Sequence, residues 1–269
     1  MRVNFFSYYP HGITRNIPER IEKAPGEINI YSDYHITQKY GNYGKNAIAI
    51  LVEPRVIIPE VYDFVEKYND SFKYIFTFDD KILSSCKNAK LLIYGQVTAE
   101  YPSPEKTKDI SMVCSNKTFC EGHRQRNEIA NALKGQIDTY GQFDGGSFCD
   151  FADFLDGYRF NVAMENCSIG YYFSEKLCNC FASRIIPIYW GCPNIGRYFD
   201  TDGILIADNY KDIPDIVKDL KKYGIEKAYK DRQKAIEHNF REVQKYRCYG
   251  IWFFDNYSQL LEDLAENDL

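Results

Sequence analysis

Apolar runs and amphipathic segments alternate along the first part of the chain. Strands are predicted by short runs rich in Ile, Val, Tyr and Phe at residues 3–8, 27–31, 47–52, 74–78 and 90–94. A helix is predicted over residues 59–68, with Pro59 in its first turn, where proline is well tolerated. Strands that alternate with helices are typical of a parallel sheet with helices packed on it. We therefore expect a Rossmann-like α/β domain in this part of the chain.

The second part of the chain shows the same alternation. Strands are predicted at residues 110–115, 137–141, 160–164 and 185–190, a helix at residues 124–134, and helices from residue 212 onward. The turn-rich segment at residues 101–108 is the best candidate for a linker. The pattern predicts an N-terminal domain at residues 1–108, a second domain at 109–250, and a helix at 251–269 that crosses back over the first domain. Two Rossmann-like domains of this kind are expected to enclose an interdomain cleft.

Two polar pairs follow apolar runs in the second part of the chain. Glu165 and Asn166 come directly after the predicted strand at residues 160–164, and Glu175 and Lys176 open a short helix that Ser174 would cap. Ligands bind at the carboxyl ends of the strands in such sheets, so both pairs should face one site. A helix start with a lysine in its first turn favours an anion such as a diphosphate. A carboxylate there suits the hydroxyl groups of a sugar such as ribose.

Five sequence elements between residues 158 and 199 occur in a recognisable order. They are YRF, MEN, YYFSEKL, IIPIYWG and RYF. This order resembles the signature of the α-1,3-fucosyltransferases, which carry Tyr-Lys-Phe, Phe-Glu-Asn, Tyr-hydrophobic-Thr-Glu-Lys and Val-Pro-hydrophobic-Gly elements. The resemblance extends upstream to Ser115-Asn116 and Arg126-Asn127, and thinly to Glu53-Pro54. Ser174 and Met164 replace a Thr and an aromatic residue of the family pattern, and neither change removes a charge or an amide.

The resemblance implies a GT-B type glycosyltransferase, with fucose on GDP as the first-ranked donor. It also implies that the domain at residues 1–108 lies on the acceptor side and that the domain at 109–250 binds the nucleotide sugar. It implies that Arg126 holds the diphosphate of the nucleotide. The chain has no Asp-x-Asp metal motif, so we expect Arg126 and Lys176 to supply the positive charge without a metal or cofactor. Glu53, at the end of the predicted central strand, is the candidate general base for an inverting transfer. The expected donor-binding residues are Arg126, Glu165, Asn166, Tyr172, Glu175 and Lys176.

Each candidate could also serve a purely structural purpose. Glu53 could cap a helix after Pro54, and Glu175 with Lys176 could form an exposed ion pair of little energetic value. The remaining candidates could act as a helix anchor (Arg126), a loop-holding carboxylate (Glu165), a turn residue (Asn166) and an ordinary packing residue (Tyr172).

Composition narrows the possible function classes. A net charge of −5 argues against a nucleic-acid-binding protein, which would carry an excess of Lys and Arg. The nine cysteines and four histidines show no metal-ligand spacing, and we expect the cysteines to be reduced thiols of an intracellular protein. The chain begins without an apolar signal segment and contains no run of 18 apolar residues, so no membrane span is expected. These features predict a cytoplasmic enzyme of a bacterium or a virus.

The sequence is also compatible with three functions that differ from fucose transfer. The same fold could use another donor, such as UDP-xylose or UDP-galactose. A non-catalytic module that binds a sugar nucleotide or a glycan would keep the basic and aromatic residues but would not need Glu53. A different enzyme on the same scaffold, such as an epimerase or a phosphorylase, is the third possibility, since fold alone does not fix function. The acceptor could be a polysaccharide, a lipopolysaccharide or a protein-linked glycan.

Overall fold

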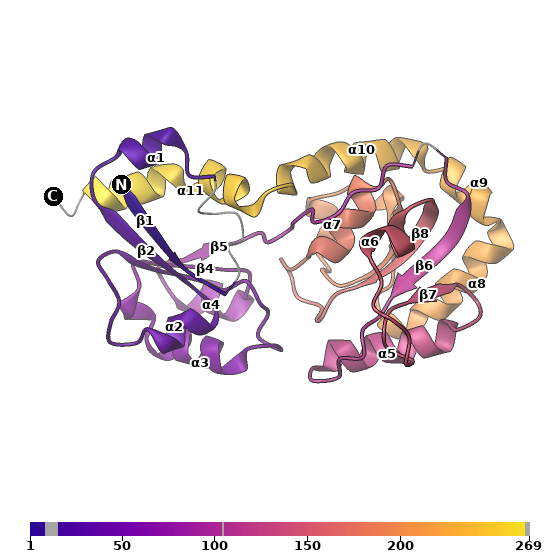
Figure 1. The fold of residues 1–269 in the computed structure, drawn as a ribbon, viewed down its shortest axis with the longest axis horizontal. Coiled ribbons are helices and arrows are strands. Elements are labelled where there is room, and N and C mark those ends of the chain that lie inside the picture. Colours follow the sequence, from indigo (N-terminus) through magenta and orange to yellow (C-terminus); the bar gives the residue numbers. More distant parts are fainter. Residues whose placement is uncertain (9–15, 104, 267–269) are drawn as a thin grey trace. The chain divides into compact units, whose positions relative to one another are not determined.

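The protein consists of two compact α/β units (Figure 1). The structure is a computed structural model that describes residues 1–8, 16–103 and 105–266. Unit 1 comprises Met1–Tyr94 together with Cys248–Leu269, and unit 2 comprises Gly95–Arg247. Each unit is built around its own parallel sheet, as the alternation of strand and helix patterns predicts.

Unit 1 contains a five-stranded parallel sheet with the strands in sequence order. Its strands are β1 (Arg2–Phe6), β2 (Glu27–Ser32), β3 (Ala47–Ile50), β4 (Tyr74–Thr77) and β5 (Ala89–Leu91). Its helices are α1 (Glu19–Lys23), α2 (Tyr34–Gln38), α3 (Pro59–Lys67), the 3-10 helix η1 (Asn69–Ser71), α4 (Asp80–Ser85) and α11 (Tyr249–Glu266).

Both faces of the unit 1 sheet are covered, which explains why its central strand is apolar throughout. Ile48 and Ile50 of β3 pack in one core cluster with residues of α1 and α11. Ala47 and Ala49 pack in a second cluster with residues of α2, α3 and α4. Because successive side chains of a strand point to opposite faces, an unbroken apolar run is what a doubly covered strand requires. The C-terminal helix α11 therefore crosses back to the first sheet, as predicted (Figure 1).

Unit 2 contains a second five-stranded parallel sheet, in the order β10-β9-β8-β6-β7. Its strands are β6 (Lys108–Val113), β7 (Asp138–Tyr140), β8 (Tyr158–Met164), β9 (Ile186–Trp190) and β10 (Leu205–Ile206). Its α-helices are α5 (Glu121–Leu133), α6 (Phe151–Leu155), α7 (Glu175–Ala182), α8 (Ile213–Tyr223), α9 (Ile225–Lys230) and α10 (Gln233–Val243). Four 3-10 helices complete it: η2 (Ile195–Arg197), η3 (Thr201–Gly203), η4 (Tyr210–Asp212) and η5 (Gln244–Tyr246).

The sheet of unit 2 has a topological switch point between β6 and β8. The chain runs from β6 outward to β7 on one side, then returns to place β8 on the other side of β6. The helices that follow β6 and β8 consequently lie on opposite faces of the sheet, and their first turns border a crevice at the carboxyl ends of these two strands. This crevice is the expected place for a ligand in an open α/β sheet.

The division between the units falls at Tyr94 and Gly95, before the turn-rich segment in which the sequence pattern places the end of the first domain, at residue 108. The residues after Gly95 are bonded to unit 2 instead of forming a linker. Thr98 and Ala99 donate their backbone N–H groups to the Asn179 Oδ1 atom of α7, at 2.9 and 3.0 Å. The Lys106 ammonium donates to the Ser183 carbonyl at 2.7 Å. The sequence pattern misplaces the boundary because turn-forming composition does not reveal hydrogen bonds to residues about 80 positions later in the chain.

None of the helices described is both long enough and apolar enough to span a lipid bilayer.

Candidate active site

A cavity of about 190 Å³ lies in unit 2 at the crevice between β6 and β8. Its apolar wall includes Phe151, Phe154 and Leu155 of α6. Its polar lining residues are Ser115, Arg126, Asn161, Glu175, Lys176 and Asn179. Three of the candidates expected from the sequence, namely Arg126, Glu175 and Lys176, are thus brought together at the topological switch point of the sheet.

Arg126 lies on α5 and is fixed from one side of its guanidinium group. The side chain is only 8% exposed, and its Nη2 atom donates to the Met164 carbonyl at 2.7 Å and to the Asn166 Oδ1 atom at 3.0 Å. Its buried Nε atom has no hydrogen-bond partner among the described residues. Arg126 therefore anchors α5 to the end of β8 and still offers a donor to a ligand. A buried donor without a partner is costly, which favours an occupant that accepts this bond.

A close approach of two backbone segments allows this arrangement. A Cβ atom at Gly122, in the first turn of α5, would lie 2.1 Å from the Asn166 carbonyl oxygen. Only glycine permits the helix to come this near to the loop after β8. Asn166 consequently contacts the guanidinium group of Arg126, and it is not among the residues that line the cavity.

Lys176 occupies the first turn of α7, as predicted, between two carboxylates. Its Nζ atom lies 2.8 Å from Glu175 Oε1 and 3.9 Å from Glu165 Oε2. Burial disfavours the ammonium ion, but the charges of Glu175 and Glu165 outweigh burial and raise the pKa of Lys176. Burial opposes the charge on Glu175 as well, and Lys176 outweighs it and lowers the pKa of that carboxyl group. Both side chains are therefore charged at neutral pH.

Glu165 is placed where it holds the start of α7. It is fully buried, its Oε1 atom accepts the Ser174 N–H at 2.9 Å, and its Oε2 atom accepts the Ser174 hydroxyl at 2.6 Å. Ser174 is the N-cap of α7, as predicted, and its Oγ accepts the Lys176 N–H. This geometry supports a loop-holding role for Glu165. Tyr172 is also buried, at 4% exposure, and neither residue is among those that line the cavity.

His123 is a residue near the site that the sequence pattern does not single out. It lies one helical turn before Arg126 on α5, is 5% exposed, and its Nδ1 atom has no partner among the described residues. Burial, followed by the charges of Arg126 and Lys117, lowers the pKa of His123 to about 4. The imidazole is therefore neutral at neutral pH, and its environment is strongly cationic.

Glu53 lies in unit 1, whereas the rest of the candidates lie in unit 2. It is exposed and follows the carboxyl end of β3. Its backbone N–H donates to Asp33 Oδ1 at 3.2 Å, and its carbonyl oxygen accepts the Tyr62 hydroxyl at 2.9 Å. No helix begins directly after Pro54, since the next helix, α3, begins at Pro59. A helix-capping role for Glu53 is therefore excluded.

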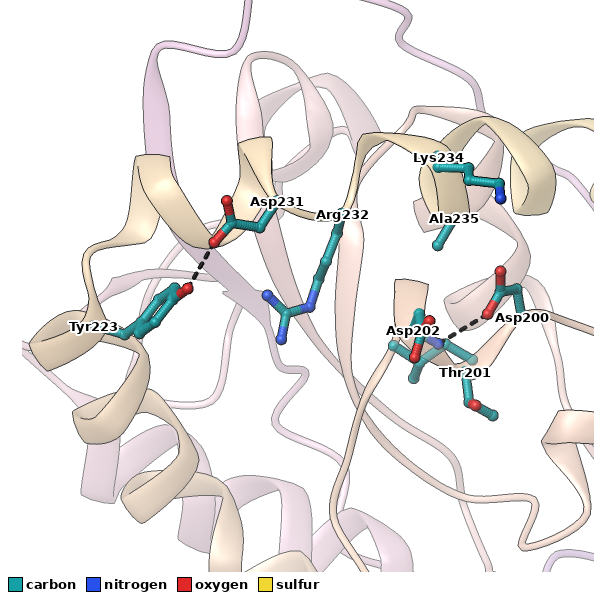
Figure 2. A pocket seen from close by; sticks show the side chains of 9 residues that line it. Asp200, Thr201, Asp202, Tyr223, Asp231, Arg232, Lys234 and Ala235 are labelled. Atoms are coloured by element: carbon teal, nitrogen blue, oxygen red, sulfur yellow. Dashed lines mark hydrogen bonds between the residues drawn. The ribbon is translucent and has the colours of Figure 1, made fainter.

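A larger cavity, of about 710 Å³, lies elsewhere in unit 2 (Figure 2). It is bordered by η3, which directly precedes β10, and by the ends of α8 and α9, so it lies at the amino end of a strand. Tyr223 donates to Asp231 Oδ2 at 2.6 Å, while Asp200 Oδ1 accepts the Asp202 N–H at 3.0 Å (Figure 2). Its charged side chains have mixed sign, since Asp200, Asp202 and Asp231 are acidic while Arg232 and Lys234 are basic. Its size does not make it the better candidate, because none of the sequence motifs reaches it.

Comparisons with known proteins identify the family. The sequence profile described as glycosyltransferase family 10 (fucosyltransferase) C-term matches residues 103–246, which is more than half of the chain. The chain belongs to glycosyltransferase family 10. The resemblance seen in the ordered motifs is confirmed, and all unit 2 candidates fall within the matched residues.

A curated relative of this family 10 chain is the α-(1,3)-fucosyltransferase FucT of Helicobacter pylori. It is 31% identical over 117 residues, which cover 43% of this chain and 24% of that protein. The alignment thus spans about a quarter of the relative's length.

Solved structures agree on the fold. An α1,3-fucosyltransferase with GDP superimposes with a TM-score of 0.59 at 16% identity, over 100% of this chain and 91% of that chain. A UDP-forming α,α-trehalose-phosphate synthase from Burkholderia xenovorans gives 0.58 at 11% identity, over 89% of this chain and 73% of that chain. At such low identity these matches show the fold alone, which is the GT-B class of two Rossmann-like domains, as predicted.

The family 10 chain should lose stability when the Ser174 hydroxyl is removed. Ser174→Ala removes a helix cap and one hydrogen bond to a buried carboxylate, which together cost roughly 2–3 kcal/mol. Burial raises the pKa of Glu165 above 4.5, while the hydrogen bond from the Ser174 hydroxyl lowers it. Without the hydroxyl, the ionised form of Glu165 is less stable in the folded protein, so the variant loses stability as the pH rises above 4.5. The loss should therefore be larger at about pH 8 than at about pH 5.

Urea unfolding at the two pH values measures this difference in the free energy of unfolding. Ser174→Thr is the matched control, because it keeps the hydroxyl and should retain most of the stability. Equal losses for the Ala and Thr variants would contradict the role given to the hydroxyl group.

Proposed function

We propose that the chain is an inverting glycosyltransferase that moves a sugar from a nucleotide diphosphate to a glycan hydroxyl, with GDP-fucose as the first-ranked donor. The observation that carries the proposal is the convergence of Arg126, Lys176 and the first turn of α7 on one cavity at the switch point of the unit 2 sheet. Family membership supports the reaction class, and a structure with the same fold is described with GDP.

The diphosphate would occupy the polar side of the cavity. The Nε atom of Arg126, the Lys176 ammonium and the amide groups at the start of α7 can all donate to phosphate oxygens. Glu175 keeps Lys176 charged and can accept hydrogen bonds from sugar hydroxyls. The volume of about 190 Å³ is smaller than a typical whole-ligand site of roughly 300 Å³ or more, so the cavity would take only the diphosphate and the groups next to it.

In the proposed reaction, Glu53 takes the proton of the acceptor hydroxyl as its oxygen attacks the anomeric carbon. The bond between that carbon and the diphosphate breaks in line, which inverts the configuration, and the electron pair stays on the diphosphate. Arg126 and Lys176 stabilise the charge that develops there. We propose that these side chains suffice without a metal. Cytoplasmic location and a polysaccharide, lipopolysaccharide or protein-linked glycan as acceptor remain predictions.

The donor can be tested by calorimetric binding and thermal shift with GDP, UDP and CMP, each with and without magnesium. Metal-independent stabilisation by GDP is the expected result. Preference for UDP would keep the reaction class and replace the donor with a sugar such as xylose or galactose. A requirement for magnesium would remove the metal-independent mechanism, and the absence of binding to all three nucleotides would overturn the proposal.

The role of Arg126 provides a sharper test of the same site. Arg126→Gln should weaken GDP binding about 10- to 100-fold, which corresponds to the loss of one charged hydrogen bond. Arg124→Gln is the matched control, because Arg124 lies on the same helix but is exposed and paired with Glu121. The control should bind GDP like the unsubstituted protein. Equal affinities of the two variants would place the diphosphate elsewhere.

A further inference from the structure

Asp33 adopts a strained backbone conformation at the carboxyl end of β2. Its φ and ψ angles are 49° and −122°, in a region that favours glycine. Side chains other than glycine persist in such conformations when the surroundings require them, and these positions cluster at functional sites. The presence of aspartate here therefore needs an explanation in terms of its carboxyl group.

The carboxyl group of Asp33 binds the backbone that carries Glu53. Its Oδ1 atom accepts the N–H groups of Val52 and Glu53, at 2.9 and 3.2 Å. The Tyr62 hydroxyl of α3 donates to the carbonyl oxygen of Glu53 at 2.9 Å. Both backbone groups of Glu53 are thus held by side chains, while its own side chain stays exposed. This arrangement fixes the direction of the Cα–Cβ bond from which the Glu53 side chain extends.

We propose that Asp33 is a positioning residue for Glu53, which holds the backbone of the base and places a second carboxyl group beside it. The inference rests on the proposed function, in which Glu53 is the general base. It adds a group from a second strand of unit 1 to the acceptor side of the reaction.

Electrostatics supports this assignment. Burial raises the pKa of Asp33 to about 7 against the lowering effect of the two N–H groups, and the charge of Glu53 raises it as well. The repulsion between the two carboxylates is mutual, so an ionised Asp33 makes Glu53 a stronger base.

Several hydroxyl groups of the described residues also face Asp33. They belong to Ser32, which donates to Asp33 Oδ2 at 3.3 Å, and to Tyr34, Tyr62 and, from α11, Tyr249. Transfer should therefore increase as the pH rises through about 7, where Asp33 becomes charged.

Two substitutions separate the backbone role from the charge. Asp33→Gly removes the carboxyl group but suits the observed φ, so relief of backbone strain offsets part of the cost of the two lost hydrogen bonds and the variant should still fold. Asp33→Asn keeps an oxygen that accepts the two N–H groups and removes the charge. Amide hydrogen exchange at Val52 and Glu53 should be faster in the Gly variant and near normal in the Asn variant.

The kinetic test measures GDP release from GDP-fucose, with the oligosaccharide that supports the fastest release in a panel, from about pH 5 to about pH 9. We expect Asp33→Gly to lower kcat about 10- to 100-fold with unchanged GDP affinity, because the base is no longer held in place. Asp33→Asn should retain more of kcat than Asp33→Gly, and its transfer rate should no longer increase as the pH rises through about 7.

The outcomes distinguish this inference from the function on which it rests. Full activity of a Glu53→Gln variant would overturn the role of the base itself. An inactive Glu53→Gln variant beside a fully active Asp33→Gly variant would overturn only the positioning role. Retention of the increase near pH 7 in Asp33→Asn would exclude Asp33 as its source. A loss in Asp33→Asn as large as that in Glu53→Gln would make Asp33 the base and overturn positioning.

Discussion

Replacing Glu53 by Gln is expected to lower kcat about 10²- to 10⁴-fold, the usual contribution of a general base. Gln has nearly the same shape, and the backbone N–H and carbonyl groups of Glu53 are held by Asp33 and Tyr62. The substitution should therefore leave the structure intact and remove only the group that accepts the proton. Steady-state kinetics with GDP-fucose and an acceptor glycan measures the loss.

Nucleotide binding provides the internal check on this variant. The proposed diphosphate ligands belong to unit 2, so Glu53→Gln should bind GDP with unchanged affinity. Glu60→Gln, at an exposed position in the first turn of α3, makes the same chemical change in unit 1 and should keep full activity. If Glu53→Gln transferred sugar at the normal rate, the proton would have to be taken by another group. If it lost GDP affinity as well, Glu53 would belong to the donor site.

The fold could be predicted because its strands are apolar on both faces. The runs at β3, β4 and β8 are almost entirely buried, and such runs are visible in the sequence without knowledge of their partners. The short helices α1, α2, α4 and α6 have five or six residues each and are not predicted by the sequence, because so few residues give no clear helical period. Their positions are set by contacts with the sheets.

The site could be predicted only where charge and motif order coincide. Arg126, Glu175 and Lys176, which the sequence analysis names as donor-binding candidates, line one cavity, and their binding role stays a prediction. Glu165 has the same chemistry as Glu175 but is fully buried, and no sequence pattern distinguishes a carboxylate that caps a loop from one that faces a ligand. Asp33 and His123 escape sequence-based prediction for a related reason. Their importance comes from a positive φ angle and from burial beside cations, which depend on the folded chain.

Replacing Lys176 by Met is expected to reduce kcat about 10²- to 10³-fold, as does the loss of a preorganised group that stabilises transition-state charge. The diphosphate gains negative charge as the sugar departs, so an ammonium group beside it stabilises the transition state more than the bound donor. GDP affinity should consequently fall less than kcat. Calorimetry and steady-state kinetics on the same preparation measure the two effects.

The same substitution should change how stability depends on pH. Burial raises the pKa of Glu165 and the positive charge of Lys176 lowers it, so removing that charge should raise the pKa of Glu165 further. When the pKa of a carboxyl group is higher in the folded state than the ordinary value of 4.5, the folded protein loses stability as the pH rises from 4.5 to the folded-state pKa. Lys176→Met should therefore unfold more easily at about pH 8 than at about pH 5, relative to the unsubstituted protein.

Lys176→Arg keeps the charge and should remove this pH effect, while its bulkier head group still lowers kcat. A Met variant with normal kcat would show that Lys176 serves only to neutralise Glu165 and Glu175, and the charge on the leaving diphosphate would then have to be stabilised by Arg126 and the amide groups of α7.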